Sequence, residues 1–420
     1  MTATPRGAVF VMPRRRDEWA DAPGLWVTAA GWAAAARQQL GAAWVVTRDG
    51  VATPEEALRF TERRVTTSTA TTSRSHSRVP IVVRTGVKDL LRAREARRHN
   101  DLRDQEVWAA IDLELVWQHH DPFHRAGEGL ARRHRCPLVV YVHAPQVWEA
   151  RQWNVKRPGW SGALEHFGDR PPLLSGDVVA CVSGEVGDEV IRLGVDPARV
   201  VVSPMAVDTV RFSPEVDGHE LRRQLGLTDA FVVGWMGTFR TFHGLDTVLD
   251  AFVAVSTSVP NARLLMVGDG AGRPEVERRI GQLGLADHVV LTGSVANRDL
   301  PRHVAAMDVA LVSAPADRAF HYSPQKLREY LACSTPAVAP RVGDVARMVT
   351  DGVDALLYEP GDAVGMARRI EQLVADPKLR SRLGRAGRAR VEQRDTWDAR
   401  LRDLLDSDAY VAAKRRLSPG

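Results

Sequence analysis

The chain has 420 residues, of which 44% are hydrophobic and 26% are charged, and its formal net charge is +5. This length is too great for a single hydrophobic core and predicts two domains, while the composition excludes a disordered chain. A positive charge this modest does not require nucleic acid, and we expect no such partner. It fits a phosphate-bearing ligand or an anionic membrane surface equally well.

Nothing near the N-terminus predicts export or membrane insertion. The basic cluster at residues 14–16 follows the apolar run 8–12 instead of preceding it, and no apolar run approaches the roughly 20 residues that span a bilayer. Cys136, Cys181 and Cys333 lie far apart and predict neither a disulfide framework nor a zinc site. We therefore expect a cytoplasmic protein, with a peripheral contact to the inner membrane face left open.

Short apolar runs alternate with amphipathic stretches along the first half of the chain. Continuous apolar runs are typical of parallel strands that are covered on both faces. The predicted strands are 8–12, 43–47, 79–83, 109–113, 137–142, 178–182 and 200–202, and helices are predicted at 26–40 and 127–134. The Ser-, Thr- and Arg-rich stretch 61–78 predicts a mobile loop.

The same alternation restarts in the second half. Strands are predicted at 231–236, 263–267, 289–292, 309–312, 336–339 and 355–358. Two successive series of strand and helix predict two doubly wound α/β domains joined by a hinge at 205–215. From 379 to 405 the composition is helical, and Trp397 is the one large aromatic side chain there, which favours an anchor in the first domain.

Residues 323–333 predict a loop that turns sharply into a helix. Ser323 is a good N-cap and Pro324 suits the first helical position. The free N–H groups of a helix start attract phosphate, and a carboxylate at Glu329 could accept hydrogen bonds from a ribose diol. For this stretch alone, an ordinary capped surface helix remains the alternative.

A second turn with a phosphate-binding character follows the predicted strand 231–236. Gly237 lets a ligand approach the backbone closely, and Arg240 and His243 place cationic or hydrogen-bonding groups beside it. Taken alone, Arg240 is equally well explained as a solvated loop charge. The glycines at 268 and 270 and the loop at 292–295 end the next two predicted strands and extend the same edge.

In the first half, His143 ends a predicted strand, and His119 and His120 follow the predicted strand before it. Open α/β sheets bind ligands at the carboxyl ends of their strands, so we expect one of these histidines to line a site. A lone histidine is otherwise a packing or capping residue. Gly24 and Trp26 lie where the first long helix is predicted to begin.

Together these motifs resemble the retaining nucleotide-sugar glycosyltransferases of family 4. The resemblance rests on residues 237–244, 267–270, 291–295, 307–311 and 323–336, with the connector at 192–214. It implies an α/β protein of the GT-B fold, with two Rossmann-like doubly wound domains facing a central cleft. The implied parts are an acceptor-side domain at 1–213, a nucleotide-sugar-binding domain at 214–395, and a C-terminal helix at 396–420 that returns to the first domain.

The resemblance implies transfer of a sugar from a nucleoside diphosphate sugar, of UDP or GDP, to an acceptor hydroxyl with retention. The acceptor classes are a glycan, a lipid-linked compound and a small molecule. Gly24 and Trp26 match part of the family's acceptor-side loop, and His119 and His120 are further acceptor-side candidates. Arg240, His243 and His143 are the catalytic candidates. We expect no metal and no other cofactor, because cationic side chains and a helix start can stabilise the leaving diphosphate. The donor-binding candidates are Gly237, Thr238, Gly268, Gly270, Ser294, Val295, His321, Ser323, Pro324, Gln325, Lys326, Leu327 and Glu329.

Two departures from the family pattern keep other readings open. His321 stands where the family commonly has a carboxylate, and His243 stands where a lysine is usual. A catalytically silent sugar-nucleotide-binding subunit and a nucleotide-sugar epimerase of the same fold are the alternatives. The epimerase would need acidic and basic groups that converge on one site, and the sequence offers no clear set.

Overall fold

The computed structural model describes residues 5–19, 23–61, 81–98, 106–108, 111–153, 155–240, 243–316 and 323–418. The chain forms two compact units. Unit 1 comprises Met1–Pro204 and Trp397–Gly420, and unit 2 comprises Met205–Thr396. The segment 205–213, which the sequence-based boundaries give to the first domain, lies in unit 2. There Val207 forms a parallel bridge with Thr396, so that the segment pairs with the last residues of unit 2.

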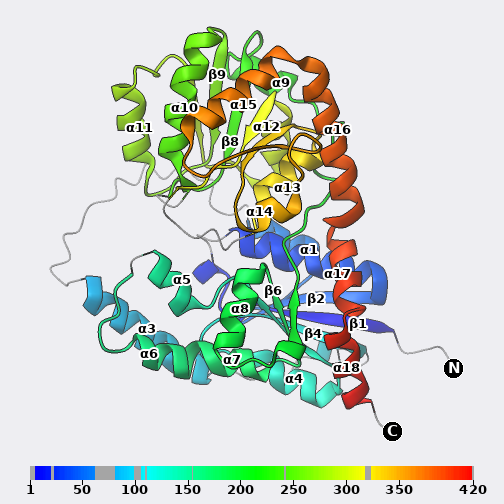
Figure 1. The fold of residues 1–420 in the computed structure, drawn as a ribbon. Coiled ribbons are helices and arrows are strands. Elements are labelled where there is room, and N and C mark those ends of the chain that lie inside the picture. Colours follow the sequence, from blue (N-terminus) through cyan, green and yellow to red (C-terminus); the bar gives the residue numbers. More distant parts are fainter. Residues whose placement is uncertain are drawn as a thin grey trace. The chain divides into compact units, whose positions relative to one another are not determined.

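Unit 1 contains a seven-stranded sheet in the order β3-β2-β1-β4-β5-β6-β7 (Figure 1). Every neighbouring pair is parallel except β2 and β3. The strands are β1 (Arg6–Val11), β2 (Gly41–Thr47), β3 (Gly50–Ala52), β4 (Asp112–His119), β5 (Leu138–Val142), β6 (Val178–Cys181) and β7 (Val200–Val202). The carboxyl ends of β1, β4 and β5 therefore lie next to one another at one edge of this sheet.

The helices of unit 1 come from both ends of the chain. They are α1 (Pro23–Leu40), α2 (Pro54–Arg59), α3 (Ile81–Arg98), α4 (Ala126–His134), α5 (Gln146–Gln152), α6 (Ser161–Leu164), α7 (Arg170–Ser175), α8 (Gly184–Arg192), α17 (Trp397–Leu405) and α18 (Asp408–Leu417). A π-helical turn, Glu165–Asp169, joins α6 to α7.

Two predicted strands of unit 1 are wrong in place or type. Of the strand expected at 79–83, residues 81–83 form the start of helix α3, and 79–80 lie outside the described residues. The β-branched residues favour a strand locally, but the packing of the whole segment determines the helix. The strand expected at 109–113 begins only at Asp112 and runs to His119. The predicted loop at 61–78 lies, apart from Thr61, outside the described residues.

Unit 2 contains a six-stranded, fully parallel sheet in the order β10-β9-β8-β11-β12-β13. The strands are β8 (Phe231–Met236), β9 (Ala262–Val267), β10 (Val289–Gly293), β11 (Val309–Leu311), β12 (Ala337–Pro340) and β13 (Leu356–Tyr358). The helices are α9 (His219–Gln224), α10 (Leu245–Ser258), α11 (Arg273–Gln282), α12 (Leu300–Ala305), α13 (Gln325–Ala332), α14 (Gly343–Met348), α15 (Ala363–Ala375) and α16 (Pro377–Arg394).

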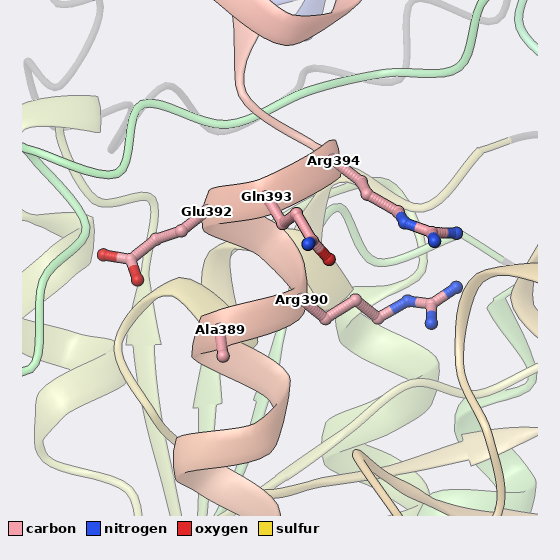
Figure 2. A pocket seen from close by; sticks show the side chains of 5 residues that line it. All are labelled: Ala389, Arg390, Glu392, Gln393 and Arg394. Carbon is pink, nitrogen blue, oxygen red and sulfur yellow. The ribbon is translucent and has the colours of Figure 1, made fainter.

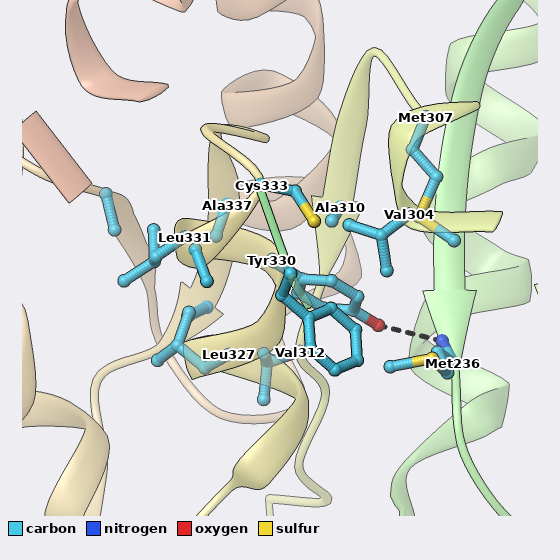
Figure 3. Packing of buried hydrophobic residues seen from close by; sticks show 14 of the residues in the cluster. Met236, Val304, Met307, Ala310, Val312, Leu327, Tyr330, Leu331, Cys333 and Ala337 are labelled. Carbon is cyan, nitrogen blue, oxygen red and sulfur yellow. Dashed lines mark hydrogen bonds between the residues drawn. The ribbon is translucent and has the colours of Figure 1, made fainter. Parts of the chain in front are cut away.

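Unit 2 has a hydrophobic core on each face of its sheet, since alternate strand residues point to opposite faces. One core includes residues of α10, α11 and α15, and the other includes residues of α12, α13 and α14. In the second core Tyr330 is fully buried, and its hydroxyl accepts a hydrogen bond of 2.8 Å from the backbone N–H of Met236 (Figure 3). This bond ties helix α13 to the end of β8.

The C-terminal segment completes the core of unit 1. The Trp397 ring packs against Trp32, with the ring centroids 5.9 Å apart, and an added Cβ at Gly31 would lie 2.3 Å from the Trp397 ring. Helix α18 adds a hydrogen bond of 2.9 Å from the Tyr410 hydroxyl to the backbone oxygen of Glu114. A glycine in α1 is therefore what leaves room for the tryptophan.

The three cysteines are all buried and all free thiols. Burial raises the pKa of each thiol, Cys136, Cys181 and Cys333, to about 12. Thiolate is the reactive form, so all three are packing residues.

Candidate functional site

Three backbone turns lie against one another at the carboxyl edge of the unit 2 sheet. The Gly237 N–H donates to Val267 at 2.9 Å, and the Phe239 N–H donates to Asp269 at 2.9 Å. A Cβ at Gly268 would lie 1.9 Å from the Gly237 carbonyl oxygen, and one at Gly270 would lie 2.8 Å from the Phe239 backbone. Glycine is required at both places, so this edge is built from backbone that a ligand can approach closely.

Lys326, in the first turn of α13, reaches back to this edge. Its ammonium lies 4.1 Å from the centroid of the Trp235 ring, and an added Cβ at Gly237 would lie 2.8 Å from the Lys326 Nζ. Burial lowers the pKa of Lys326 to about 7, and the charge of Glu329 opposes that shift. The ammonium is thus held by an aromatic face and a glycine instead of by a directly bonded carboxylate.

Glu329 lies one turn further along α13 and is 4% exposed. Burial raises the pKa of Glu329 to about 7, while Arg211, a hydrogen bond from Gln325 and the charge of Lys326 act in the opposite direction. A buried carboxyl group with incomplete compensation is typical of a functional position. Arg211 belongs to the connector that the sequence motif marked, but sequence reasoning did not single it out.

The N-cap prediction for Ser323 is wrong. The N-cap residue of α13 is Pro324, and no side chain among the described residues caps the helix. The Ser323 hydroxyl instead donates to Asp344 at 2.7 Å and accepts from Arg328 at 2.7 Å. Arg328 is 1% exposed and also pairs with Asp395 at 3.2 Å. This buried network holds the loop, and within the described ranges no side chain accepts a hydrogen bond from the first backbone N–H groups of α13, those of Gln325 and Lys326.

The turn after Gly237 carries the other donor-side candidates. Arg240 and Thr238 are exposed, and the Thr238 hydroxyl lies 3.5 Å from Nε2 of His243. Burial, with smaller contributions from Lys326 and Arg240, lowers the pKa of His243 far below its usual value. His243 is therefore neutral at physiological pH, so it can hydrogen-bond but cannot supply the positive charge that a lysine would.

The remaining donor-side candidates are placed as follows. Ser294 is exposed and Val295 is partly buried, in the loop that follows β10, and Gly293 accepts a backbone hydrogen bond from Gly268 at 3.0 Å. The Gln325 amide donates to the Ala206 carbonyl at 3.0 Å. Pro324 and Leu327 are buried within the loop and helix start. His321 lies outside the described residues.

In unit 1 the structure brings His119 and His143 together at the ends of β4 and β5. Their ring centroids lie 5.2 Å apart in an edge-to-face arrangement, and Tyr141 packs against His143 at 5.3 Å. Burial lowers the pKa of His143 to about 4, and burial followed by the charge of His143 lowers that of His119. Both rings are neutral at physiological pH, and the buried Nε2 of His143 has no hydrogen-bond partner among the described residues.

His120 serves a different purpose. Its Nε2 lies 3.2 Å from the Asp169 carboxylate, and Asp169 accepts hydrogen bonds from the backbone N–H groups of Gln146 at 3.1 Å and Val147 at 2.8 Å. Asp169 is fully buried. The pair therefore fixes the start of α5, directly after the His143 loop, and His120 is a positioning residue instead of a ligand-contacting one.

Sequence reasoning missed the arginines of this edge. Arg14 follows β1 and forms a two-pronged ion pair with Asp121, which follows β4. Arg92, from α3, donates to the Gln146 side chain. Burial and the positive charge of Arg14 lower the pKa of Arg92, while the charge of Asp121 raises it. Among the described residues Arg92 has no directly paired carboxylate, so this edge carries an incompletely neutralised guanidinium.

Two acceptor-side candidates lie elsewhere. Trp26 is 1% exposed and packs edge-to-face on Phe60 at 5.0 Å, so it is a core residue. Gly24 lies in the first turn of α1, where its carbonyl accepts from Thr28 at 2.8 Å and an added Cβ would meet nothing within 4 Å. Neither geometry requires a ligand.

A hollow on unit 2 lies apart from these residues. It is lined by Ala389, Arg390, Glu392, Gln393 and Arg394, all on the last two turns of α16 (Figure 2). Arg390 is already paired with Asp354 at 3.4 Å. Within the described ranges no three His, Cys, Asp or Glu side chains are grouped as a metal site would require.

Comparison with known proteins places both units in one family. The family model of glycosyltransferase family 4 matches residues 24–211, and that of glycosyl transferases group 1 matches residues 230–376. The chain is 31% identical over 303 residues, covering 70% of its own length and 76% of the other, to the GDP-mannose-dependent alpha-(1-6)-phosphatidylinositol monomannoside mannosyltransferase of Mycolicibacterium smegmatis. It is 29% identical over 315 residues (72% and 73%) to the D-inositol 3-phosphate glycosyltransferase of Xylanimonas cellulosilytica.

A solved structure agrees in fold. The crystal structure of Anabaena HepE in complex with UDP and glucose superposes with a TM-score of 0.63 at 19% identity, covering 96% of this chain and 99% of that one. These matches confirm the resemblance seen in the sequence motifs. The chain therefore belongs to glycosyltransferase family 4 (glycosyl transferases group 1), has the GT-B fold and is a glycosyltransferase.

Proposed function

We propose that this glycosyltransferase binds a UDP- or GDP-sugar on unit 2 and an acceptor on unit 1, and transfers the sugar with retention and without a metal ion. One observation carries the proposal. Lys326 converges on the glycine turn at Gly237, beside the uncapped start of α13, with Glu329 one turn further along the same helix.

This arrangement suits the two halves of a nucleoside diphosphate. Backbone N–H groups at a helix start, together with an ammonium, favour the diphosphate. The buried carboxyl group of Glu329 would accept hydrogen bonds from the ribose hydroxyls. The choice between UDP and GDP rests on relatives alone, since one is named as GDP-mannose-dependent and HepE was solved with UDP.

In the reaction, the bond between the anomeric carbon and the diphosphate oxygen breaks while the acceptor oxygen bonds to the same carbon. Negative charge then develops on the leaving diphosphate, where Lys326 and Arg240 would stabilise it. The acceptor proton passes to a phosphate oxygen of the leaving group on the same face of the sugar, so the products are the glycoside and the nucleoside diphosphate. His243, being neutral, would hydrogen-bond the sugar or phosphate.

For the acceptor, the incompletely neutralised Arg92 and the neutral histidines of unit 1 favour a hydroxyl compound that carries a phosphate. Two relatives bear names that contain a phosphorylated inositol. A planar guanidinium binds phosphate oxygens in pairs, whereas the Nε2 of His143 could accept or donate one hydrogen bond to an acceptor hydroxyl. The proposed acceptor class is therefore a phosphorylated polyol, free or lipid-linked.

One assay separates this proposal from the alternatives. The purified chain is incubated with UDP- and GDP-sugars, with and without inositol 3-phosphate, in the presence of EDTA, and the products are followed by NMR. Transfer in EDTA with the donor's anomeric configuration kept supports the proposal, and an inverted product or a strict metal requirement contradicts it. An epimerised donor would indicate an epimerase, and donor binding without turnover under any condition would indicate a silent subunit.

Donor binding is tested separately through Glu329. UDP or GDP should raise the melting temperature, because a ligand of the native state adds stability by mass action. Glu329→Ala should weaken binding between about tenfold and a hundredfold, the range for a hydrogen bond to a charged group. An exposed control, Glu275→Ala on α11, should bind as the unchanged protein does. Equal shifts in both variants would contradict the role of Glu329.

A further inference from the structure

Helix α3 turns an apolar face to the solvent. Val83, Val87, Leu90 and Leu91 are 50%, 51%, 73% and 55% exposed. They follow one another at helical spacing and so form one stripe. Among the described residues, four of the twelve exposed large apolar side chains lie on this one helix, and the other eight lie singly along the sequence. A surface helix normally has the reverse arrangement.

The opposite face of α3 is the one that packs on unit 1. Asp89 is 7% exposed and accepts hydrogen bonds from Arg157 at 2.8 Å and from the Trp160 indole at 3.1 Å. Ala96 is fully buried, and Gly86 faces the Trp160 ring. The helix is therefore fixed in rotation, and the exposed stripe is not the result of a loosely attached segment.

Basic side chains border the stripe. Arg84, Lys88 and Arg94 are exposed, while Glu95, the one exposed acid among the described residues of α3, lies 3.9 Å from Arg48. Aliphatic side chains rimmed by Lys and Arg are the pattern of a helix that lies in a membrane interface and contacts anionic lipid headgroups.

We infer that the outward face of α3 docks unit 1 on an anionic lipid bilayer, with Val83, Val87, Leu90 and Leu91 in the headgroup–acyl boundary and Arg84 and Lys88 on the headgroups. The helix lies on the bilayer and does not enter it further: among the described helices, none is long and apolar enough to cross a membrane. Arg92 leaves the same helix on its inner side and contacts Gln146. Arg92 would thus bind the phosphate of a lipid-linked acceptor about one helix width from the bilayer surface.

The test uses the full chain and two kinds of vesicle, phosphatidylcholine alone and phosphatidylcholine with an equal part of phosphatidylglycerol. Flotation measures the bound fraction without any sugar donor or acceptor, so the result is independent of the proposed reaction. We expect binding to the phosphatidylglycerol vesicles only. Leu90→Gln with Leu91→Gln should lower the partition at least about tenfold, and Arg84→Gln with Lys88→Gln about fivefold for each cation removed.

The matched control is Val364→Gln on α15, which removes an exposed aliphatic side chain (61% exposed) from unit 2 and should bind as the unchanged chain does. Circular dichroism and donor-induced thermal shift establish that each variant is folded. Vesicle binding that survives Leu90→Gln/Leu91→Gln, or no binding to phosphatidylglycerol vesicles at all, overturns the inference. If sedimentation shows a dimer that the double variant dissociates, the face belongs to a second copy instead.

Discussion

The carboxyl edges of the two sheets use their polar residues differently. In unit 2 the edge is mostly backbone: three glycine-dependent turns, one ammonium over an aromatic ring and one buried carboxyl group. In unit 1 the polar side chains largely satisfy one another, as Arg14 does with Asp121 and His120 with Asp169. In the proposed reaction the first edge binds the nucleotide-sugar donor, whereas Arg92 and His143, among the described residues of the second edge, contact the acceptor.

The two units also differ in which segments of the chain stabilise them. Unit 2 is continuous in sequence, whereas unit 1 requires residues 397–420 from the far end of the chain. Trp397→Ala should therefore destabilise unit 1 by about 3–5 kcal/mol, the cost of removing a buried tryptophan. Calorimetry should show one transition moved to lower temperature, with donor binding retained below it.

Trp397→Phe is the control, because it keeps an aromatic ring against Trp32, leaves a smaller cavity and should cost less than Trp397→Ala. If Trp397→Ala melts like the unchanged protein, residues 397–420 do not stabilise unit 1, and the proposed difference between the units is wrong.

Gly237→Ala tests whether the carboxyl edge of the unit 2 sheet needs bare backbone to bind the donor. Gly237 has φ +149°, and the added Cβ would displace the Lys326 ammonium. Misplacing such a group should lower kcat/KM at least about a hundredfold. Gly284→Ala is the control, since Gly284 also has positive φ but an added Cβ there meets nothing within 4 Å. Similar kinetics in the two variants would show that only backbone strain was measured.

Arg92→Met tests whether the carboxyl edge of the unit 1 sheet binds the phosphate of the acceptor. Loss of a charge-assisted contact should raise KM for a phosphorylated acceptor between about tenfold and a hundredfold, with KM for the donor unchanged. Inositol 3-phosphate and inositol are compared as acceptors, because the variant should lose the preference between them. Arg132→Met, on α4 with a side chain 78% exposed, is the control. An unchanged preference would remove phosphate from the acceptor class.

The smallest effect is a pH dependence of nucleoside diphosphate binding. Burial raises the pKa of Glu329 to about 7 and lowers that of Lys326 to about 7. As the pH rises towards 7, Glu329 ionises and becomes a better acceptor. Above pH 7 Lys326 loses its proton, so affinity for the diphosphate falls by at most about tenfold per pH unit.

Calorimetric titration across this range should therefore give maximal affinity near pH 7. Lys326→Met should flatten the alkaline limb, and Glu329→Gln the acidic limb. An alkaline limb that persists in Lys326→Met would assign the titration to another group.

The sequence predicted the parallel sheets well, because buried parallel strands are continuous apolar runs, as Phe231–Met236 shows. It failed at α3, whose first residues favour a strand locally. It located the glycine turns and helix α13 because glycine spacing and a helix start are local signals, and their binding of the donor stays a prediction. It missed Arg92, Arg211 and Asp169, whose positions depend on contacts far apart in sequence. It misassigned Ser323 because the Ser323 hydroxyl forms tertiary hydrogen bonds with Arg328 and Asp344 instead of capping the helix.

The three unreactive thiols make the protein a convenient carrier for a chemical reporter. Because the thiols of Cys136, Cys181 and Cys333 are buried and protonated, a maleimide dye should leave the native chain unmodified. A single cysteine introduced at the exposed Leu90 would then be the one labelled position, without prior removal of the native three. An environment-sensitive dye placed there would report, by a blue shift in its emission, whether that position leaves water when lipid is added.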